Sequence, residues 1–320
     1  MTLSQMQVFN EYVMPATIET LAQMVEKFNA ASAGSIVLTT TGFDGDFLQE
    51  SFFQAVHTAQ RRVDRYAAQG TPSATDLTEL KRSGVKIAGG FGPIRFEPSQ
   101  LTWLQRPTTQ GIEVASRNFA EALLQDQLNT AIAALVAAIG NQSAATNDIS
   151  GGSAVSYSAI NAAHGLFGDR SGGLVAQVMT GSMYHKLIGQ NLTNTARLFT
   201  STQVNVVDIL GRAVIVTDAP SLTVASPATD SVLSLASGAS IVYDGGDVIS
   251  NIDTVNGKTR IETTMQVDYS FGLSLLGYTW NESVGGKSPT DAELATGSNW
   301  TKVATSIKQT AGVITIGDQA

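Results

Sequence analysis

The sequence predicts an α+β fold, and three observations support that prediction. Apolar residues recur every three or four positions through residues 114–139, which is the periodicity of an amphipathic helix (Leu124, Leu128, Ile132, Leu135 and Ile139). Residues 221–270 instead alternate short apolar runs with turn residues, as the strands of a sheet do. Hydrophobic residues make up 43% of the 320 residues, so the chain can bury a sizeable core.

The first 54 residues are predicted to combine a helix with an extended arm. Apolar residues take helical spacing from Ala16 onward, and Pro15 fits the first turn of that helix. From residue 31 the composition shifts to Gly, Ser and Thr, with a short strand expected at 36–40 and a turn at 42–45. We therefore expect residues 31–54 to form an extended N-terminal arm.

Residues 55–110 are predicted to form a long hairpin-like excursion. A loop is expected at 70–72 and a short helical piece at 76–82. Val85 and Ile87 then alternate with polar residues before a glycine-rich run at 89–93, and alternation that closes on glycines is typical of a hairpin.

The elements that follow are predicted from periodicity and turn residues. The helix at 114–139 ends at Gly140-Asn141, and its 26 residues span roughly 40 Å. Residues 141–153 resemble a polar linker. Residues 155–200 are expected to form two helices broken at 168–173, the second running through Leu174, Val178, Met183, Leu187 and Ile188. Residues 210–217 (LGRAVIVT) are expected to form a buried strand that ends at Asp218-Ala219-Pro220.

The composition favours a surface that is occupied by neighbouring molecules. Charged residues make up only 14% of the chain, against about 25% in typical globular domains. The absence of cysteine excludes disulfides and thiolate metal sites. Residues 1–10 lack the features of a signal peptide, and the longest apolar span, Leu128–Ile139, is about half the roughly 20 residues that a bilayer needs. We expect a soluble protein made in a cytoplasm, with no membrane partner.

The net charge of −8 is unevenly distributed along the chain. Residues 61–106 contain eight basic and four acidic residues, whereas residues 208–253 contain six aspartates and one arginine. The basic stretch could bind nucleic acid, although it has few interleaved aromatic residues. Pairing between subunits of opposite charge is at least as good an explanation, and two solvated faces are a third.

Two segments imitate a phosphate-binding loop, at 257–259 (Gly-Lys-Thr) and 285–288 (Gly-Gly-Lys-Ser). That motif needs a glycine five residues before its second glycine, because backbone amides must wrap the phosphates. Those positions hold Ile252 and Asn281. The pattern therefore does not predict a nucleotide site.

The second of these segments is better explained as the start of a helix. Ser288 is predicted as the N-cap, with Pro289 at the first helical position and Asp291 completing a capping box. Trp300 is expected to be a buried apolar anchor shortly after that helix.

No constellation of chemically active residues is visible in the sequence. The three histidines, His57, His164 and His185, are scattered, and the nearest pair is 21 residues apart. No Gly-x-Ser-x-Gly elbow for a nucleophilic serine is present. We predict a protein that is not an enzyme, with no catalytic, cofactor-binding or metal-ligating residues and no cofactor.

Three features, in order, resemble the major capsid proteins of tailed bacteriophages, which share the Hong Kong 97-type fold. A long helix follows an arm and an excursion, as the spine helix of that family follows its N-arm and E-loop. A pair of helices precedes residues 210–218 (LGRAVIVTD), which are similar to a strand of the family's axial domain. Near the C-terminus, Tyr278-Thr279-Trp280 is followed by SPTDAEL at 288–294 and by Asn299-Trp300, which is similar to the family's C-terminal signature.

The resemblance implies a division of the chain and a function. The implied regions are an N-terminal arm (1–54), an E-loop with peripheral-domain strands (55–110), a spine helix and peripheral domain (111–153), an axial domain of sheet and helices (154–265) and a C-terminal return to the peripheral domain (266–320). The implied function is self-assembly, in the cytoplasm of a bacterial host, into the icosahedral shell of a virion that encloses double-stranded DNA.

The resemblance also implies partners. They are copies of the chain itself in hexamers and pentamers, a separate scaffolding protein, a portal protein, decoration proteins in some shells, and packaged DNA held by weak, non-specific contacts. Two alternatives stay open at this point: an encapsulin-type compartment shell with the same fold, and a tail or sheath protein that would form tubes.

Overall fold

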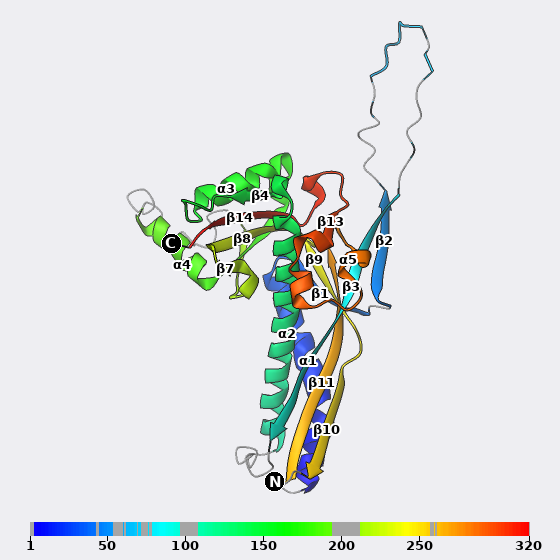
Figure 1. Ribbon diagram of the computed structural model, residues 1–320, viewed down its shortest axis with the longest axis vertical. Coiled ribbons are helices and arrows are strands. Elements are labelled where there is room, and N and C mark those ends of the chain that lie inside the picture. The colour runs from blue at the N-terminus through cyan, green and yellow to red at the C-terminus, as the bar shows by residue number, and fades with distance from the viewer. Residues whose placement is uncertain are drawn as a thin grey trace.

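The computed structural model describes residues 3–42, 45–53, 60, 62–68, 70–71, 76, 79–96, 108–193, 212–256, 259 and 261–319. Within these residues a long central helix, α2 (Thr108–Gly140), has one six-stranded sheet on either side of it (Figure 1). The α+β prediction is confirmed. The long helix and the two sheets form the framework against which the other described elements pack.

The first sheet contains the longest strands of the molecule. Its strand order is β1-β9-β11-β3-β2, and β10 extends it by pairing with β11. The strands are β1 (Ile36–Gly42), β2 (Phe47–Phe53), β3 (Glu79–Phe96), β9 (Ser240–Asp244), β10 (Ile249–Asn256) and β11 (Ile261–Leu275). The distal part, made of β10, residues 261–268 of β11 and residues 89–96 of β3, is called the leg below; it runs alongside α1 and α2 (Figure 1).

The second sheet is more compact and lies across α2 from the first. Its strand order is β4-β14-β8-β5-β6, with β7 on β8. The strands are β4 (Thr146–Asp148), β5 (Leu174–Met179), β6 (Ala213–Val216), β7 (Thr223–Ala225), β8 (Ala228–Ala236) and β14 (Gly312–Asp318). Helices α3 (Tyr157–Leu166) and α4 (Gly181–Thr193) flank this sheet, and 3₁₀ turns occupy Ser143–Ala145, Gly168–Gly173 and Pro220–Leu222.

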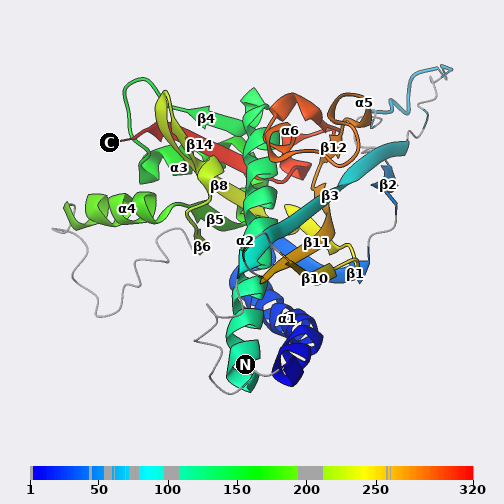
Figure 2. The ribbon, with the colours of Figure 1, turned by 60° about the horizontal axis from the view of Figure 1, so that its bottom comes forward.

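The N-terminal helix is longer than predicted. Helix α1 spans Leu3–Ala31 and lies alongside α2 (Figure 2), so Pro15 sits within the helix and not in its first turn. A proline inside a helix removes one hydrogen bond, but Pro15 is exposed and the buried face around Val13 and Thr17 keeps its packing. Tertiary packing supplies most helix stability, which is why the local proline signal was misleading.

The segment after α1 does not extend freely from the body. The predicted strand at 36–40 is confirmed as β1, which pairs parallel with β9, and residues 47–53 pair with β3. The described residues of 31–54 therefore belong largely to the first sheet. The role of residues 1–54 as an arm stays a prediction.

The predicted long helix is confirmed and begins six residues earlier than expected, at Thr108. Its 33 residues correspond to a rod of about 50 Å. Ile132, Leu135 and Ile139 are fully buried at the centre of the main core. By length and composition α2 could cross a membrane, but half of its most apolar window is buried, as expected for a core helix.

Strand β3 includes two segments for which the sequence predicted other structures. Residues 79–82 were expected to be helical but pair with β2, and the glycines at 89–92 lie within the strand, not in a turn. A Cβ atom on Gly89 would lie 2.8 Å from the ring of Tyr269. Gly89 therefore gives room for a large side chain on the neighbouring strand, a requirement that is visible only in the paired sheet.

Three predictions in the second sheet were wrong in part. The supposed linker 141–153 contains β4, which pairs with β14, and residues 174–179 form strand β5 where the second helix was expected to begin. A short apolar run such as LVAQVM fits a buried strand as well as a buried helix. The strand predicted at 210–217 is confirmed over 213–216, but β6 is a half-buried edge strand; residues 210 and 211 lie outside the described part of the chain.

The chain crosses between the two sheets more often than the predicted regions imply. Strands β9 and β10 fall in the range assigned to the axial domain but pair in the first sheet. Strand β14 near the C-terminus pairs in the second sheet, and the boundary at 265/266 falls inside β11.

Candidate assembly surfaces

The C-terminal signature segment forms a small, well-packed unit. Strands β12 (Tyr278–Trp280) and β13 (Trp300–Lys302) pair antiparallel, which brings the rings of Trp280 and Trp300 edge to face at 4.9 Å. Trp300 is 1% exposed, and its indole Nε1 donates a hydrogen bond to the carbonyl of Leu294 at 3.0 Å. The prediction of a buried anchor at Trp300 is confirmed.

The predicted helix start is present but shifted by two residues. Helix α6 (Asp291–Leu294) has Thr290 as its N-cap, and the side chain of Glu293 completes the capping box. Ser288 instead has a φ of 52°, a left-handed conformation that is not that of a cap residue. The sequence contains two overlapping Ser/Thr-x-x-acid patterns, and only the backbone conformation decides between them.

This unit is fixed against the C-terminal end of α2. A Cβ atom on Gly297 would lie 2.8 Å from the carbonyl oxygen of Ala137, so only glycine allows the close approach. The side-chain amide of Asn141 donates to the carbonyl of Gly297 at 3.0 Å. The signature therefore holds the C-terminal segment on the long helix, which is a packing role.

The second segment that resembles a phosphate-binding loop, residues 285–288, has a structural role. A Cβ atom on Gly285 would lie 2.1 Å from the indole of Trp280, and Lys287 forms an ion pair with Asp46 at 2.6 Å. This ion pair lowers the pKa of Asp46 and raises the pKa of Lys287. In the first such segment, residues 257–259, Gly257 and Lys258 lie outside the described residues.

The histidines do not come together in the structure. His164 is buried beneath the second sheet, where Arg212 donates to its Nδ1 and its Nε2 lies 2.9 Å from the hydroxyl of Ser234. Burial and the charge of Arg212 lower the pKa of His164 to about 4. His185 is exposed on α4 beside Tyr184, and His57 lies outside the described residues. In the part of the chain that the structure describes, no three potential ligands gather into a metal site.

The hairpin of β2 and β3 is anchored to the signature segment at its root. Ser83 on β3 donates through its hydroxyl to Glu282 at 2.7 Å, and its backbone N–H donates to Thr279 at 2.8 Å. Lys81 adds an ion pair to Glu282 at 3.4 Å, and Arg82 pairs with Glu50 across the hairpin. These contacts fix the direction in which the hairpin leaves the body.

Beyond this root the hairpin carries an outlying segment, residues 62–68, far from the rest of the molecule (Figure 1). All seven residues are exposed, including Val63 and Tyr66, whose exposed fractions are 62% and 101%. Residues 62–68 lie within the predicted excursion, whereas residues 79–96 of its predicted range form strand β3 of the first sheet, and the role of residues 55–110 as an E-loop stays a prediction.

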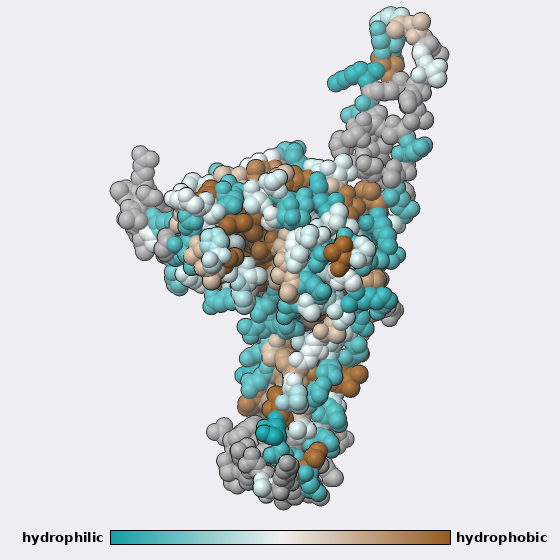
Figure 3. All heavy atoms as spheres, in the orientation of Figure 1, coloured by the Kyte–Doolittle hydropathy of each residue, from teal (hydrophilic) through white to brown (hydrophobic). Residues whose placement is uncertain are grey.

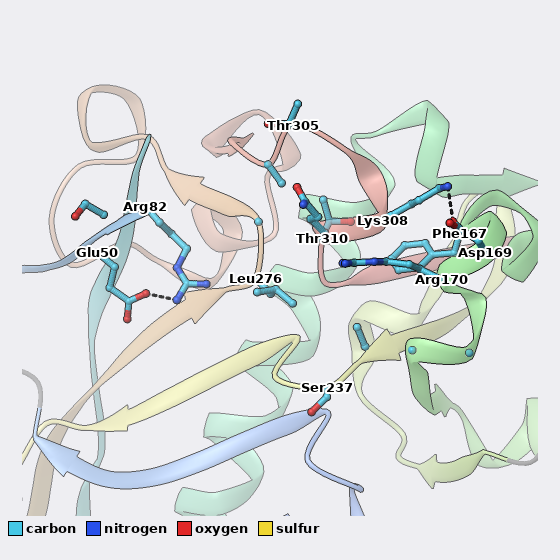
Figure 4. A pocket seen from close by; sticks show the side chains of 17 residues that line it. Glu50, Arg82, Phe167, Asp169, Arg170, Ser237, Leu276, Thr305, Lys308 and Thr310 are labelled. Atoms are coloured by element: carbon cyan, nitrogen blue, oxygen red, sulfur yellow. Dashed lines mark hydrogen bonds and ion pairs between the residues drawn. The ribbon is translucent and has the colours of Figure 1, made fainter. Parts of the chain in front are cut away.

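A large hollow of about 900 Å³ lies beside the hairpin root, between the two sheets (Figure 4). One wall carries the Arg82–Glu50 pair, and the other carries Lys308, which pairs with Asp169. Arg170 also lines it. The hollow is open to solvent, and both halves of the subunit contribute charged side chains to its border.

Comparison with known proteins agrees with this geometry. The family described as "Major capsid protein 13-like" matches residues 5–314. No curated protein sequence matches the chain.

Among solved structures, the capsid asymmetric unit of cyanophage Pam1 is similar over 88% of both chains, with a TM-score of 0.53 and 12% identity. The structure from Mycobacterium phage Adephagia covers 91% of this chain and 90% of its own, with a TM-score of 0.51 and 10% identity. That from Microbacterium phage Oxtober96 covers 77% and 84%, with a TM-score of 0.51 and 16% identity.

These likenesses confirm the Hong Kong 97-type capsid fold, with α2 as the spine helix. The family match extends over nearly the whole chain and decides in favour of a phage head over a bacterial compartment or a tail sheath. The chain belongs to the Major capsid protein 13-like family, and it is a structural, non-enzymatic protein that assembles with copies of itself into the shell of a phage head.

Proposed function

We propose that the subunits assemble as hexamers and pentamers that together close an icosahedral shell, with each outlying segment laid across a neighbouring subunit. The observation that carries this proposal is the full exposure of residues 62–68 at the end of an anchored hairpin. Ordering a segment costs roughly 1–2 kcal/mol per residue in backbone entropy, which contacts within the isolated subunit do not offset. Binding to a neighbour supplies the missing contacts.

We also propose a functional division of the subunit that follows its sheets. The first sheet with α1 and α2 forms the peripheral domain, and the second sheet with α3 and α4 forms the axial domain that surrounds the capsomer axis. Support comes from the strand pairing, which keeps the two sheets separate on either side of α2. Residues 154–239 and 312–318 then belong to the axial domain, and residues 240–275 return to the peripheral domain.

The further partners are a separate scaffolding protein, a portal protein, and packaged double-stranded DNA bound weakly through its phosphates. Decoration proteins would bind the outer surface of the finished shell.

Negative-stain electron microscopy and light scattering of the purified protein test the assembly proposal. The protein is expressed with and without the neighbouring genes that encode a candidate scaffold and portal. Pentamers, hexamers and closed shells are the expected species. A protein that stays monomeric at micromolar concentration with every candidate scaffold would refute the proposal, and tubes would contradict the closed shell.

A further inference from the structure

Strand β10 (Ile249–Asn256) is an edge strand of the leg, and its outer edge has no partner among the residues that the structure describes. It pairs only with β11, in an antiparallel register that runs from Ile249 opposite Asp268 to Asn256 opposite Ile261. In Figure 1 it forms one border of the leg. An edge strand presents a row of backbone N–H and C=O groups, which another strand can bind.

Strand β10 lacks the devices that usually protect an edge strand from pairing. Such strands are commonly short, are interrupted by bulges, or carry proline or lysine. Strand β10 (ISNIDTVN) has eight residues, contains neither proline nor lysine, and pairs with β11 without a bulge. In contrast, the edge strands β4, β6 and β7 have only three or four residues, and β1 has an irregular register. The edge of β10 is therefore open to a further strand.

Two large aliphatic side chains are exposed near the two ends of β10. Met265 and Val267 of β11 are buried, so they lie on the face of the leg that packs on the helices. The opposite face, called the outer face of the leg, carries the odd-numbered residues of β10. Among these, Ile249 is 67% and Val255 is 51% exposed. The leg in Figure 3 is otherwise mainly hydrophilic, with isolated apolar residues.

The sequence of β10 is self-complementary when two copies pair antiparallel about a two-fold axis that passes beside Ile252. Ile249 of one copy then lies opposite Val255 of the other, and Asn251 lies opposite Asp253. The symmetry makes each of these pairs occur twice. Ile249 and Val255 bury their exposed surface against each other, and the side-chain amide of Asn251 can donate to the carboxylate of Asp253.

The neighbouring symmetric registers are less favourable. Two-fold symmetry keeps the outer faces of both legs on the same side of the joined sheet, so the register can shift only in steps of two residues. A shift in one direction places Asp253 opposite Asp253 of the second copy, and like charges directly opposite each other are destabilising. A shift in the other direction places Ile249 opposite Asp253 and leaves both aliphatic side chains without an apolar partner. Apolar and charged residues therefore favour the same register, and an identical strand as the partner.

We propose that β10 of one subunit pairs antiparallel with β10 of a second copy, which joins the two legs into one continuous sheet. The overlap of residues 249–255 would supply about six to eight backbone hydrogen bonds. The contact is isologous, because both subunits use the same patch, and a closed icosahedral shell contains the two-fold axes that it needs. This inference rests on the proposed assembly function and adds one interface to it.

Disulfide cross-linking of assembled particles tests this register, because the chain contains no cysteine of its own. In the proposed contact position 252 faces itself, with Cα atoms about 4.5–5.5 Å apart, a distance that a disulfide bridges. Particles of the Ile252→Cys variant are treated with a mild oxidant, dissolved in detergent without reductant and analysed by gel electrophoresis. A covalent dimer is expected as the major species.

Ser250→Cys is the matched control on the same strand. In the proposed register Ser250 lies opposite Thr254, so the two introduced cysteines are four residues apart, about 13 Å, which is too far for a disulfide. This variant should give at least about fivefold less dimer than Ile252→Cys. The double variant Ser250→Cys/Thr254→Cys places cysteines directly opposite each other and should cross-link again.

Two results would overturn the inference. One is an equal yield of dimer from Ile252→Cys and Ser250→Cys, because cross-linking would then not depend on the register. The other is particles of the double variant that contain no dimer, because the edge of β10 then does not meet a second β10. The double variant keeps Ile252, so it decides the matter even where Ile252→Cys does not fold. Failure of the wild type to form particles refutes the proposed assembly function instead.

Discussion

Acid is expected to destabilise the second sheet through His164. The neutral imidazole accepts a hydrogen bond from Arg212 at Nδ1, so its Nε2–H donates to Ser234. Protonation would put a second positive charge next to the guanidinium in a site where His164 is only 4% exposed. Burial and this neighbouring charge lower the pKa of His164 to about 4, from a usual value near 6.5.

The size and sign of the effect follow from the two pKa values. Between pH 4 and 6.5 the unfolded chain binds the proton more tightly than the folded one, so stability rises with pH. The full stability is present above about pH 6.5 and is lost as the pH falls toward 4. A difference of 2.5 pKa units corresponds to about 3 kcal/mol in total, of which about 2 kcal/mol is lost at pH 5.

Urea unfolding of dispersed subunits, followed by circular dichroism at pH 8 and pH 5, measures this loss. The His164→Gln variant provides an amide that can accept from Arg212 and donate to Ser234 but cannot titrate. Wild type should lose about 2 kcal/mol more than this variant between the two pH values. His185→Gln, which removes an exposed imidazole, is the matched control and should behave as wild type. Equal losses in wild type and His164→Gln would show that His164 is not the acid-sensitive group.

Three other perturbations test the signature segment and the hairpin. Trp300→Ala should lower the free energy of unfolding by about 3–5 kcal/mol, because the indole is fully buried. Urea unfolding measures this loss, and a loss below about 1 kcal/mol would contradict the role of Trp300 as a buried anchor. Thr290→Ala should lower the free energy of unfolding by about 1 kcal/mol, because the N-cap is lost, and Ser288→Ala should lower it distinctly less. Thermal melts in which Ser288→Ala is the less stable variant would show that Ser288 is the cap. Replacing residues 62–68 by a glycine-serine linker should leave the circular dichroism spectrum unchanged but prevent particle formation, so normal particles in electron micrographs would refute the role of this segment.

The sequence alone determined the features whose signals are local. The apolar stripe from Leu124 to Ile139 predicted the long helix, because a helix of this length repeats its pattern often enough to be unambiguous. The order of the excursion, the helix and the C-terminal signature was sufficient to predict the family. The buried position of Trp300 followed from its size and its place after a helix start.

Only the tertiary structure decided which of several locally acceptable conformations each short segment adopts. LVAQVM at 174–179 became a strand because β8 and β6 pair with it on both sides, and Pro15 was accommodated because α1 packs on α2. The choice of Thr290 over Ser288 as the cap depended on backbone conformation. The composition of the leg's outer face depended on the register of β10 against β11, since Asp253 and Asp268, 15 positions apart in the sequence, share one surface only once the strands are paired. Pairing and packing energies act between distant segments, and no local pattern encodes them.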